Sequence, residues 1–163
     1  YNFYYYDKDN RLIKETNSLW NSKSYIYNNL NQIISKTDEN WNVINYSYDY
    51  LWNILQTKEI LKDSIKVTSY KYDIYGNLIE LTDSNNNITK YNYNNLNQLV
   101  SQVYPDNQVY NFEYDNLWRL VKKTDANWTI VTNIYDDFHI LKIVLIYELQ
   151  TNHKKRKNLK TSE

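Results

Sequence analysis

Residues 70–83 have the sequence YKYDIYGNLIELTD, from Tyr70 to Asp83, and form the most complete copy of a motif that recurs along the chain. The copies begin at Tyr4, Tyr25, Tyr46, Tyr70, Tyr91, Phe112 and Asn133. The period is therefore 21 residues, with a single step of 24 between the third and fourth copies. A fixed period of about 20 to 50 residues indicates a repeat architecture, in which similar units lie side by side.

Each copy contains an aromatic residue (Asn133 in the last copy), a Tyr two positions later, an Asp or Asn, and then a turn that is followed by Leu or Ile. A polar segment and a second turn complete the copy. The predicted first-turn residues are Asn10, Asn31, Trp52, Gly76, Asn97, Trp118 and His139. The predicted second-turn residues are Trp20, Trp41, Asn86, Asn107 and Trp128. In the third copy, three extra residues displace the second turn to about residues 62–64.

The segments between these turns have the properties of short β-strands. They are rich in Tyr, Ile, Val and Thr, and turn signals every 8 to 12 residues are typical of antiparallel strands joined by tight turns. Residues 44–48 and 131–135 alternate in the way that places side chains two apart on one face of a sheet. No segment sustains the apolar i, i+3, i+4, i+7 pattern of a helix. The sequence therefore predicts an all-β fold of repetitive antiparallel β-hairpins, with about seven 21-residue repeats.

Composition excludes several classes of protein. The 163 residues include no Cys, no Met, one Gly and one Pro, and their formal net charge is zero. Without Cys there is no disulfide framework or thiolate metal site. No apolar run reaches about 18 residues, so no membrane span is expected. Zero net charge gives no field that would recruit nucleic acid, and no nucleic-acid partner is expected. The chain starts inside a repeat without Met, so we expect a fragment whose export signal lies elsewhere.

The repeat pattern decays near the C-terminus. Residues 140–147 are apolar enough for either one buried strand or a short helix. The basic run that follows, residues 153–157, is expected to belong to a disordered, solvated tail rather than to a nucleic-acid site. We therefore divide the chain into a repeat region, 4–141, and a divergent C-terminal segment, 142–163.

The motif resembles the YD repeat of bacterial Rhs proteins, their wall-associated relatives, the shell component of insecticidal toxin complexes, and the teneurins. The resemblance covers residues 4–141 and is carried by four clear copies, at residues 4–7, 46–49, 70–78 and 112–115. It implies a curved, spiralling strip of antiparallel sheet that forms a hollow shell, which in bacteria commonly encloses a C-terminal toxin. Seven copies are too few to close such a shell, and the family's Gly- and Pro-rich core-end segment is missing. The resemblance therefore assigns neither self-cleavage nor a toxin cargo to this chain.

All five tryptophans occupy turn positions at which the YD family has Gly: Trp20, Trp41, Trp52, Trp118 and Trp128. A bulky residue in a left-handed turn costs of order 1–3 kcal/mol. Three explanations remain open. The indole rings form sugar-stacking platforms, or they lie over neighbouring hairpins, or a UGA codon that the cell reads as Gly has been translated as Trp. The third explains the Gly deficit as well, and five UGG codons in the gene would eliminate it.

We identify no catalytic, cofactor-binding or metal-binding residue in the sequence. His139 occupies a turn position, and neither it nor His153 has a partner at metal-ligand spacing. Five Asp residues follow the second Tyr of a copy and could suggest Ca²⁺ or paired-carboxylate sites: Asp7, Asp49, Asp73, Asp115 and Asp136. Their recurrence before each turn favours capping of that turn by the Asp side chain. The Tyr-rich strand faces are expected to form cross-strand aromatic ladders first, and ligand surfaces second.

These observations favour a non-catalytic structural role. The chain is expected to be a β-shell or scaffold segment of a large secreted or cell-surface YD-repeat protein, outside the cell or in its envelope. Its expected partners are the rest of that chain and a possible toxin cargo or glycan. The alternative is a surface module that binds carbohydrate or a partner protein through Tyr pairs such as Tyr91 and Tyr93. An isolated fragment with open sheet edges is expected to self-associate.

Overall fold

The computed structural model describes residues 1–136, 141–148, 155–156 and 160–161, which belong to two compact units, Tyr1–Asn87 and Ile88–Glu163. The first unit contains β1 (Phe3–Tyr6), β2 (Leu12–Thr16), β3 (Ser22–Tyr27), β4 (Ile33–Thr37), β5 (Val43–Tyr48), β6 (Ile54–Ile60), β7 (Ile65–Tyr72) and β8 (Leu78–Thr82). The second contains β9 (Ile88–Tyr93), β10 (Leu99–Val103), β11 (Val109–Tyr114), β12 (Leu120–Thr124), β13 (Thr129–Tyr135), β14 (Leu141–Glu148), β15 (Lys155–Arg156) and β16 (Lys160–Thr161).

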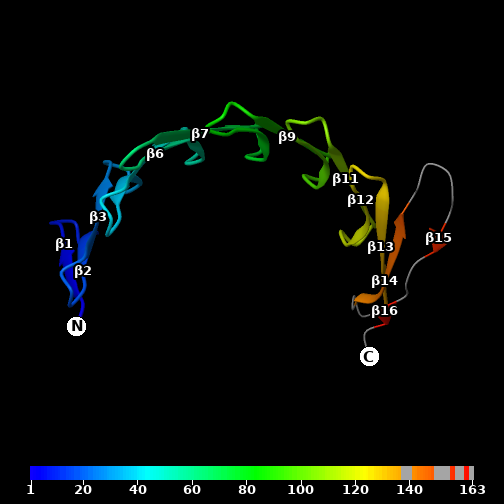
Figure 1. Cartoon of the computed structure of the whole chain (residues 1–163), viewed down its shortest axis with the longest axis horizontal. Helices are drawn as coiled ribbons and strands as arrows, with labels where there is room; N and C mark the ends of the chain where they lie inside the picture. The colour runs from blue at the N-terminus through cyan, green and yellow to red at the C-terminus, as the bar shows by residue number, and fades with distance from the viewer. Residues whose placement is uncertain (137–140, 149–154, 157–159, 162–163) are drawn as a thin grey trace. The chain divides into compact units, whose positions relative to one another are not determined.

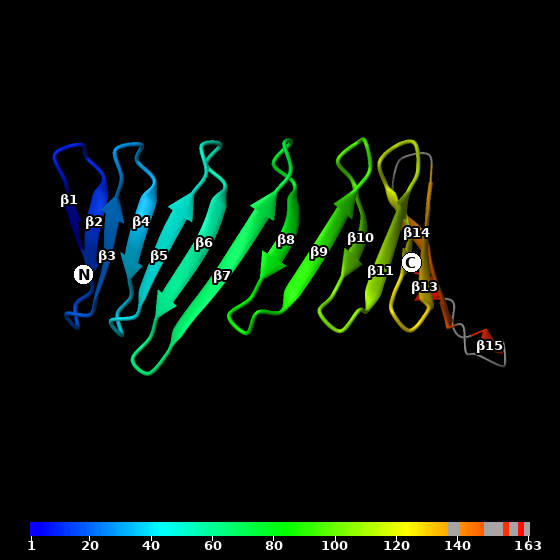
Figure 2. The same cartoon turned by 90° about the horizontal axis from the view of Figure 1, so that it is seen from above.

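From β1 to β8 and from β9 to β14 the strands follow one another in chain order, and every strand is antiparallel to its neighbour (Figures 1 and 2). In the first unit the run from β1 to β8 follows a curve in Figure 1. No described residue is helical. The predicted all-β strip of antiparallel hairpins is thus confirmed. None of the described segments is a helix long and apolar enough to cross a bilayer.

The predicted turn residues are the residues with left-handed backbone. Gly76 has φ 84°, and the ten non-Gly residues with positive φ are Asn10, Trp20, Asn31, Trp41, Trp52, Asn86, Asn97, Asn107, Trp118 and Trp128. These eleven positions are all the predicted turn residues except His139, which lies outside the described residues. The displaced turn of the third copy is also confirmed, because β6 and β7 are joined through Leu61–Ser64, whose backbone atoms are hydrogen-bonded at 2.9 Å.

Every first-turn hairpin carries a register shift that the sequence did not predict. In the hairpin of β7 and β8, Lys71 pairs with Glu80 but Tyr72 pairs with Leu78, so Ile79 is an extra residue. Equivalent shifts separate β1 from β2, β3 from β4, β5 from β6, β9 from β10, β11 from β12 and β13 from β14. A bulge bends its strand and increases the local twist, so each repeat contributes the same bend.

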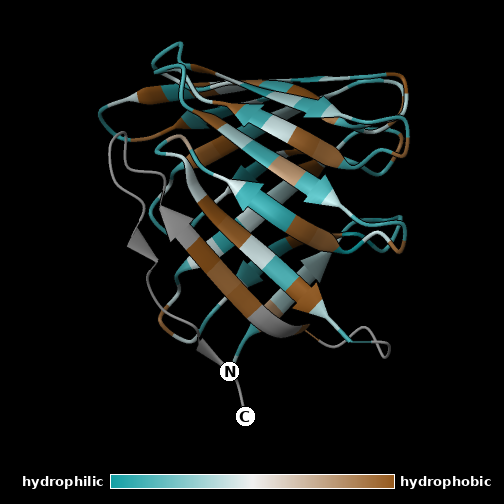
Figure 3. Cartoon of the chain, turned by 90° about the vertical axis from the view of Figure 1, so that its right-hand side faces the viewer, coloured by the Kyte–Doolittle hydropathy of each residue, from teal (hydrophilic) through white to brown (hydrophobic). Residues whose placement is uncertain are grey.

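The sheet of each unit is a single layer without a hydrophobic core. Among the described residues no hydrophobic side chain is buried, and the buried residues are the polar Thr16, Gln32 and Thr89. Hydrophilic and hydrophobic residues alternate along the strands (Figure 3). In β11, for example, Tyr110 and Phe112 are half-buried while Val109 and Asn111 are exposed. Because no second layer covers either face, stability comes from contacts between neighbouring strands.

Residues 141–148 form a strand rather than a short helix. β14 pairs with β13 over seven positions, from Thr129 opposite Glu148 to Tyr135 opposite Leu141. Two-residue strands β15 and β16 also pair with β14. Most of the basic run predicted to be disordered lies outside the described residues, and the boundary placed at residue 141 stays a prediction.

The open edge of β1 predicts self-association. Its exposed aromatic residues, which include Tyr4 and Tyr5, lie on a strand with one side unpaired, and such edges accept strands from other chains. We expect the 163-residue chain to show concentration-dependent association by analytical ultracentrifugation, and Tyr5→Lys to reduce it. Tyr50→Lys, at an exposed turn residue, is the matched control. A soluble monomer at high concentration would contradict the prediction.

Candidate functional site

The recurring feature of the structure is a turn capped by its own first side chain. In the turn of residues 73–77, Gly76 N donates to Asp73 O at 3.1 Å, and Asp73 N donates to Asn77 O at 3.0 Å. Asp73 Oδ1 accepts the backbone N–H groups of Tyr75 and Asn77, both at 2.9 Å. The side-chain amide of Asn77 donates to Asp73 Oδ2 at 2.8 Å. One carboxylate therefore receives three hydrogen bonds within five residues.

The same cap recurs at both ends of the hairpins. An Asp or Asn side chain accepts the N–H groups two and four positions later at Asp7, Asn17, Asn28, Asp38, Asp49, Asp73, Asp83, Asn94, Asp115 and Asp125. This confirms the predicted capping role for Asp7, Asp49, Asp73 and Asp115. The cap of the second turns was not predicted, although an Asp or Asn three positions before the turn residue signals it.

The residue four positions after the cap matches the cap chemically. The Asp caps of first turns receive a side-chain donor, as from Asn53 to Asp49 at 2.9 Å. The Asn caps of first turns are followed instead by Gln, and the direction reverses, because Asn28 Nδ2 donates to Gln32 Oε1 at 2.6 Å. Asn94 and Gln98 repeat this pair at 2.7 Å. In the described first turns, Asp is therefore paired with Asn or Arg, and Asn with Gln.

These hydrogen bonds lower the pKa of the capping carboxylates. The side-chain amides of Asn42, Asn53, Asn77 and Asn87 are the largest cause that holds the pKa values of Asp38, Asp49, Asp73 and Asp83 below the ordinary range. For Asp7 the backbone N–H of Arg11 is the largest cause of the lowered pKa. For Asp115, burial has the largest single influence and raises the pKa, but the hydrogen bonds from Arg119 and Leu117 and the charge of Arg119 lower it, and the net pKa is below the ordinary range.

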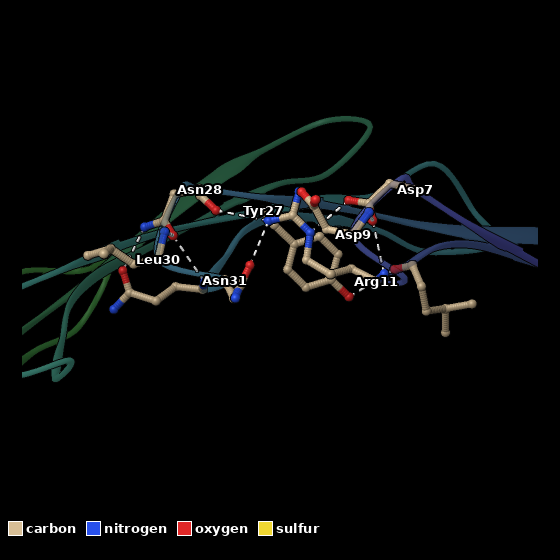
Figure 4. Close-up of polar contacts among 9 residues, drawn as sticks. Asp7, Asp9, Arg11, Tyr27, Asn28, Leu30 and Asn31 are labelled. Atoms are coloured by element: carbon tan, nitrogen blue, oxygen red, sulfur yellow. Dashed lines mark hydrogen bonds and ion pairs between the residues drawn. The ribbon is translucent and has the colours of Figure 1, made fainter.

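Two arginines extend the cap to the next repeat. Arg11 Nε donates to Asp7 Oδ2 at 2.7 Å, and its Nη1 donates to Asn28 O at 3.2 Å and to Asn31 Oδ1 at 2.8 Å (Figure 4). Its guanidinium lies 5.1 Å from the centre of the Tyr27 ring. Arg11 therefore joins two consecutive first turns through hydrogen bonds and a cation–π contact.

Arg119 makes the equivalent connection in the second unit. Its Nε donates to Asp115 Oδ2 at 2.7 Å, its Nη1 donates to Asp136 O at 3.3 Å, and its guanidinium lies 4.8 Å from the centre of the Tyr135 ring. Sequence reasoning missed both arginines. The available signal was an Arg four positions after the Asp of a copy.

The Tyr that precedes the cap joins its repeat to the one before it. The hydroxyl of Tyr27 donates to Leu12 O at 2.8 Å, and that of Tyr48 donates to Ile33 O at 2.6 Å. Tyr72 and Tyr135 form the same bond with Ile54 and Leu120. The paired residues of β2 and β3 end at Lys14 and Ser24, so the Leu12 carbonyl lies beyond the ladder and the tyrosine satisfies it.

The predicted cross-strand aromatic ladders are only partly correct. The register places Phe112 opposite Lys123, Tyr25 opposite Lys36 and Tyr46 opposite Thr57. Rings therefore face lysines more often than other rings, and Lys123 lies 5.9 Å from the centre of Phe112. One aromatic pair forms within the hairpin of β10 and β11, between Tyr104 at the start of the turn and Tyr110 in β11, with ring centres 5.3 Å apart.

The five tryptophan rings lie mostly in solvent. Their exposed fractions range from 55% for Trp52 to 81% for Trp41, which does not favour the hypothesis that they cover neighbouring hairpins. Trp20 does stack on Phe3, with ring centres 6.3 Å apart. A Cβ added to Gly76 would meet nothing closer than Asn53 Oδ1 at 4.0 Å, so such a turn has space for a side chain and the cost is in the backbone. The codon hypothesis stays open.

The described residues contain no group of three His, Cys, Asp or Glu side chains that could hold a metal ion. The capping carboxylates lie in separate turns, and in each turn Oδ1 accepts backbone N–H groups of that turn. His139 and His153 lie outside the described residues, so their roles stay predictions.

The family model of the teneurin YD-shell matches residues 2–156. The chain belongs to the teneurin YD-shell family. The crystal structure of TcdB2-TccC3-Cdc42 is similar, with a TM-score of 0.73 and 15% identity, over 85% of this chain and 9% of that chain. The TcdB2-TccC3 structure gives a TM-score of 0.72, also at 15% identity, with the same coverage of 85% and 9%. The Tc holotoxin pore of Photorhabdus luminescens gives 0.55 and 12% identity, over 93% and 12%.

No curated protein sequence matches the chain. At 12–15% identity the structural similarities show the fold alone. This YD-shell chain spans about a tenth of the solved chains that it resembles. Membership of the YD-shell family supports the structural, scaffold role that the sequence predicted.

The hydroxyl–carbonyl bond of Tyr27 predicts a measurable contribution to stability. Tyr27→Phe removes the donor and leaves Leu12 O beyond the strand ladder, so the free energy of unfolding should fall by about 1 kcal/mol. Urea denaturation followed by circular dichroism measures it. Tyr25→Phe on the same face of β3 is the matched control and should change little; equal losses in both variants would refute the assignment.

The lowered pKa values predict loss of stability in acid. Six capping carboxylates have pKa values below their ordinary 3.8, so their contribution is complete above that pH and is lost as pH falls through the folded pKa values. The urea midpoint should fall between about pH 4 and pH 2. The double substitution Asp73→Asn with Asn77→Gln copies the Asn28–Gln32 pair and should weaken this dependence; an unchanged acid profile would contradict the prediction.

Proposed function

We propose that this chain forms a stretch of the wall of a larger YD-repeat shell that lies outside the cell or in its envelope. The observation that carries the proposal is a single-layer sheet that buries no hydrophobic side chain among its described residues. A compact domain of this length would enclose a core. A layer without one suits a wall that is continued by further strands at its edges.

The recurring caps at the hairpin ends support the same role. The Asp and Asn caps use their oxygens to hold turns, and the tyrosine hydroxyls and arginines join one hairpin to the next. Groups committed to such bonds serve the backbone rather than a substrate. The chain accordingly acts as a scaffold and performs no catalysis, and a cargo enclosed by the complete shell is the further part of this proposal.

Electron microscopy of the protein encoded by the complete gene tests whether this chain forms part of a shell wall. The expected result is a hollow particle whose wall is one sheet thick and contains this segment. A compact particle in which the segment packs against a second layer would refute the proposal. Density for a separate domain inside the particle would support an enclosed cargo. An empty interior would refute the cargo and leave the wall proposal intact.

The alternative function is binding of carbohydrate or a partner protein by the Tyr-rich face. Partial burial of the phenol groups argues against this alternative. Tyr46, Tyr48, Tyr72 and Tyr91 are partly withdrawn from solvent, and this burial raises their pKa values. A glycan array compares the chain with its Tyr91→Ala and Tyr93→Ala variants. Reduced binding by the variants would favour the alternative over a purely structural face.

A further inference from the structure

The first turn of the first copy repeats the residues that hold a guanidinium group one repeat later. There, the guanidinium of Arg11 lies 5.1 Å from the centre of the Tyr27 ring. Its Nη1 donates to Asn28 O at 3.2 Å and to Asn31 Oδ1 at 2.8 Å (Figure 4). The residues 21 positions before these three partners are Tyr6, Asp7 and Asn10. We call the ring and hydroxyl of the first, the carbonyl of the second and the side-chain oxygen of the third the Tyr6 site.

The two turns have the same backbone. Asn10 has φ 60° and Asn31 has φ 62°. In the first turn, Asn10 N donates to Asp7 O at 3.0 Å. In the later turn, Asn31 N donates to Asn28 O at 3.1 Å, and the same carbonyl also accepts Arg11 Nη1. A carbonyl oxygen has two lone pairs, so Asp7 O in the same geometry can accept a guanidinium as well. The Tyr6 site is therefore preformed.

The Tyr6 site lies on the open side of the first unit. β1 pairs with β2 through one of its sides. Tyr6 is 55% exposed, whereas Tyr27, which carries a guanidinium on its ring, is half-buried. Among the described residues, none donates to Asn10 Oδ1 and none accepts the Tyr6 hydroxyl. The groups that bind an arginine one repeat later are thus available here to a strand added at β1.

The turn residue distinguishes the copies that follow an arginine from those that do not. Arg11 lies before a copy whose turn residue, Asn31, offers a side-chain acceptor. The next two turn residues of this kind in the first unit are Trp52 and Gly76, which offer none, and the residue equivalent to Arg11 before each of them is not an arginine. Because Asn10 is an asparagine like Asn31, the Tyr6 site matches the turn that binds an arginine.

One tyrosine serves both the arginine and the residue after it. Tyr27 carries the Arg11 guanidinium on its face, and its hydroxyl donates to Leu12 O at 2.8 Å. In the second unit, Tyr135 holds the arginine and leucine of the preceding repeat in the same way. Tyr6 therefore suits a ligand that presents a guanidinium together with the backbone carbonyl of the next residue. A peptide strand has both groups at this spacing.

We propose that the Tyr6 site binds the arginine of a strand that adds to the open edge of β1. The register of β2 and β3 sets the position of this strand, because Lys14 lies opposite Ser24 and Arg11 precedes Lys14 by three residues. Shifted by one repeat, the incoming arginine lies three residues before the residue opposite Phe3. The occupant is a preceding hairpin with Arg–Leu or Arg–Ile after its first turn. Its identity rests on the proposed wall function.

A second copy of this chain does not suit the site. Arg11 and Arg119 are both held by turns of their own unit. The strands that follow them, β2 and β12, are paired on both sides. The arginine therefore comes from a strand outside the described residues, as expected for a segment of a larger shell.

The full chain carrying a second copy of residues 1–21 at its N-terminus tests the proposal. The duplicate places an arginine and a leucine before the original first copy at the natural period. We expect the duplicate to pair with β1, which slows amide hydrogen exchange in β1. Arg11→Gln in the duplicate, a change to the side chain found at the equivalent position in the next copy, should quicken exchange of the duplicate's strand amides about tenfold.

A second variant identifies the acceptor. Asn10→Gly in the original copy suits the positive φ and removes the side-chain oxygen, so it should also quicken this exchange. Both changes together should cost no more than Arg11→Gln alone, because they remove the same contact. In the chain without the duplicate, Asn10→Gly should not quicken exchange in β1. Asn86→Gly, at a second turn with φ 62°, is the matched control and should change nothing in the duplicate.

Three results would overturn the proposal: a duplicate that stays unpaired, unchanged exchange with Arg11→Gln in the duplicate, or equal effects of Asn10→Gly and Asn86→Gly. Any of these beside a hollow particle in electron microscopy would remove the arginine site and leave the wall function. Coupling between the duplicate's arginine and Asn10 beside a compact particle would do the reverse.

Discussion

The structure depends on the hydrogen bonds by which an Asp or Asn side chain closes its own turn. Eleven reversals place a residue in the left-handed region, and at ten of them a side-chain oxygen three residues earlier accepts two backbone N–H groups across the turn. Because each of these caps is complete within five residues, these ten reversals form from local sequence. A chain that contains one Gly can therefore reverse direction eleven times with left-handed residues, ten of which are Asn or Trp.

The consequence is a fold stabilised by neighbours rather than by a core. Within each unit, strands contact the strands beside them, and no described hydrophobic side chain is fully buried. In a globular domain a hydrophobic core holds the elements together. Here the hydroxyl of Tyr27 and the guanidinium of Arg11 contribute to this, because they couple one hairpin to the next. Stability in such an array is approximately the sum of the stabilities of single repeats and of the contacts between neighbours.

The positions of the turns could be predicted from the sequence because they depend on local chemistry. Asn and Gly tolerate positive φ, and the Trp positions followed from the period. The bulge at Ile79 could not be predicted, because it depends on which residues pair across the hairpin. The lysine partners of the rings depend on the same register.

The three extra residues of the third copy have a consequence for how such sheets change length. Tyr72 still bonds to Ile54 O, at 3.0 Å, although 18 residues separate them instead of the 15 between Tyr48 and Ile33. The additional residues lengthen β6 and β7 only toward the loop at residues 62–64. The edge of the sheet formed by the first turns thus keeps the same contacts from repeat to repeat, while a hairpin can lengthen at the opposite edge, where the second turns lie. Natural insertions, or an engineered epitope, can project from that edge without disturbing the neighbouring hairpins.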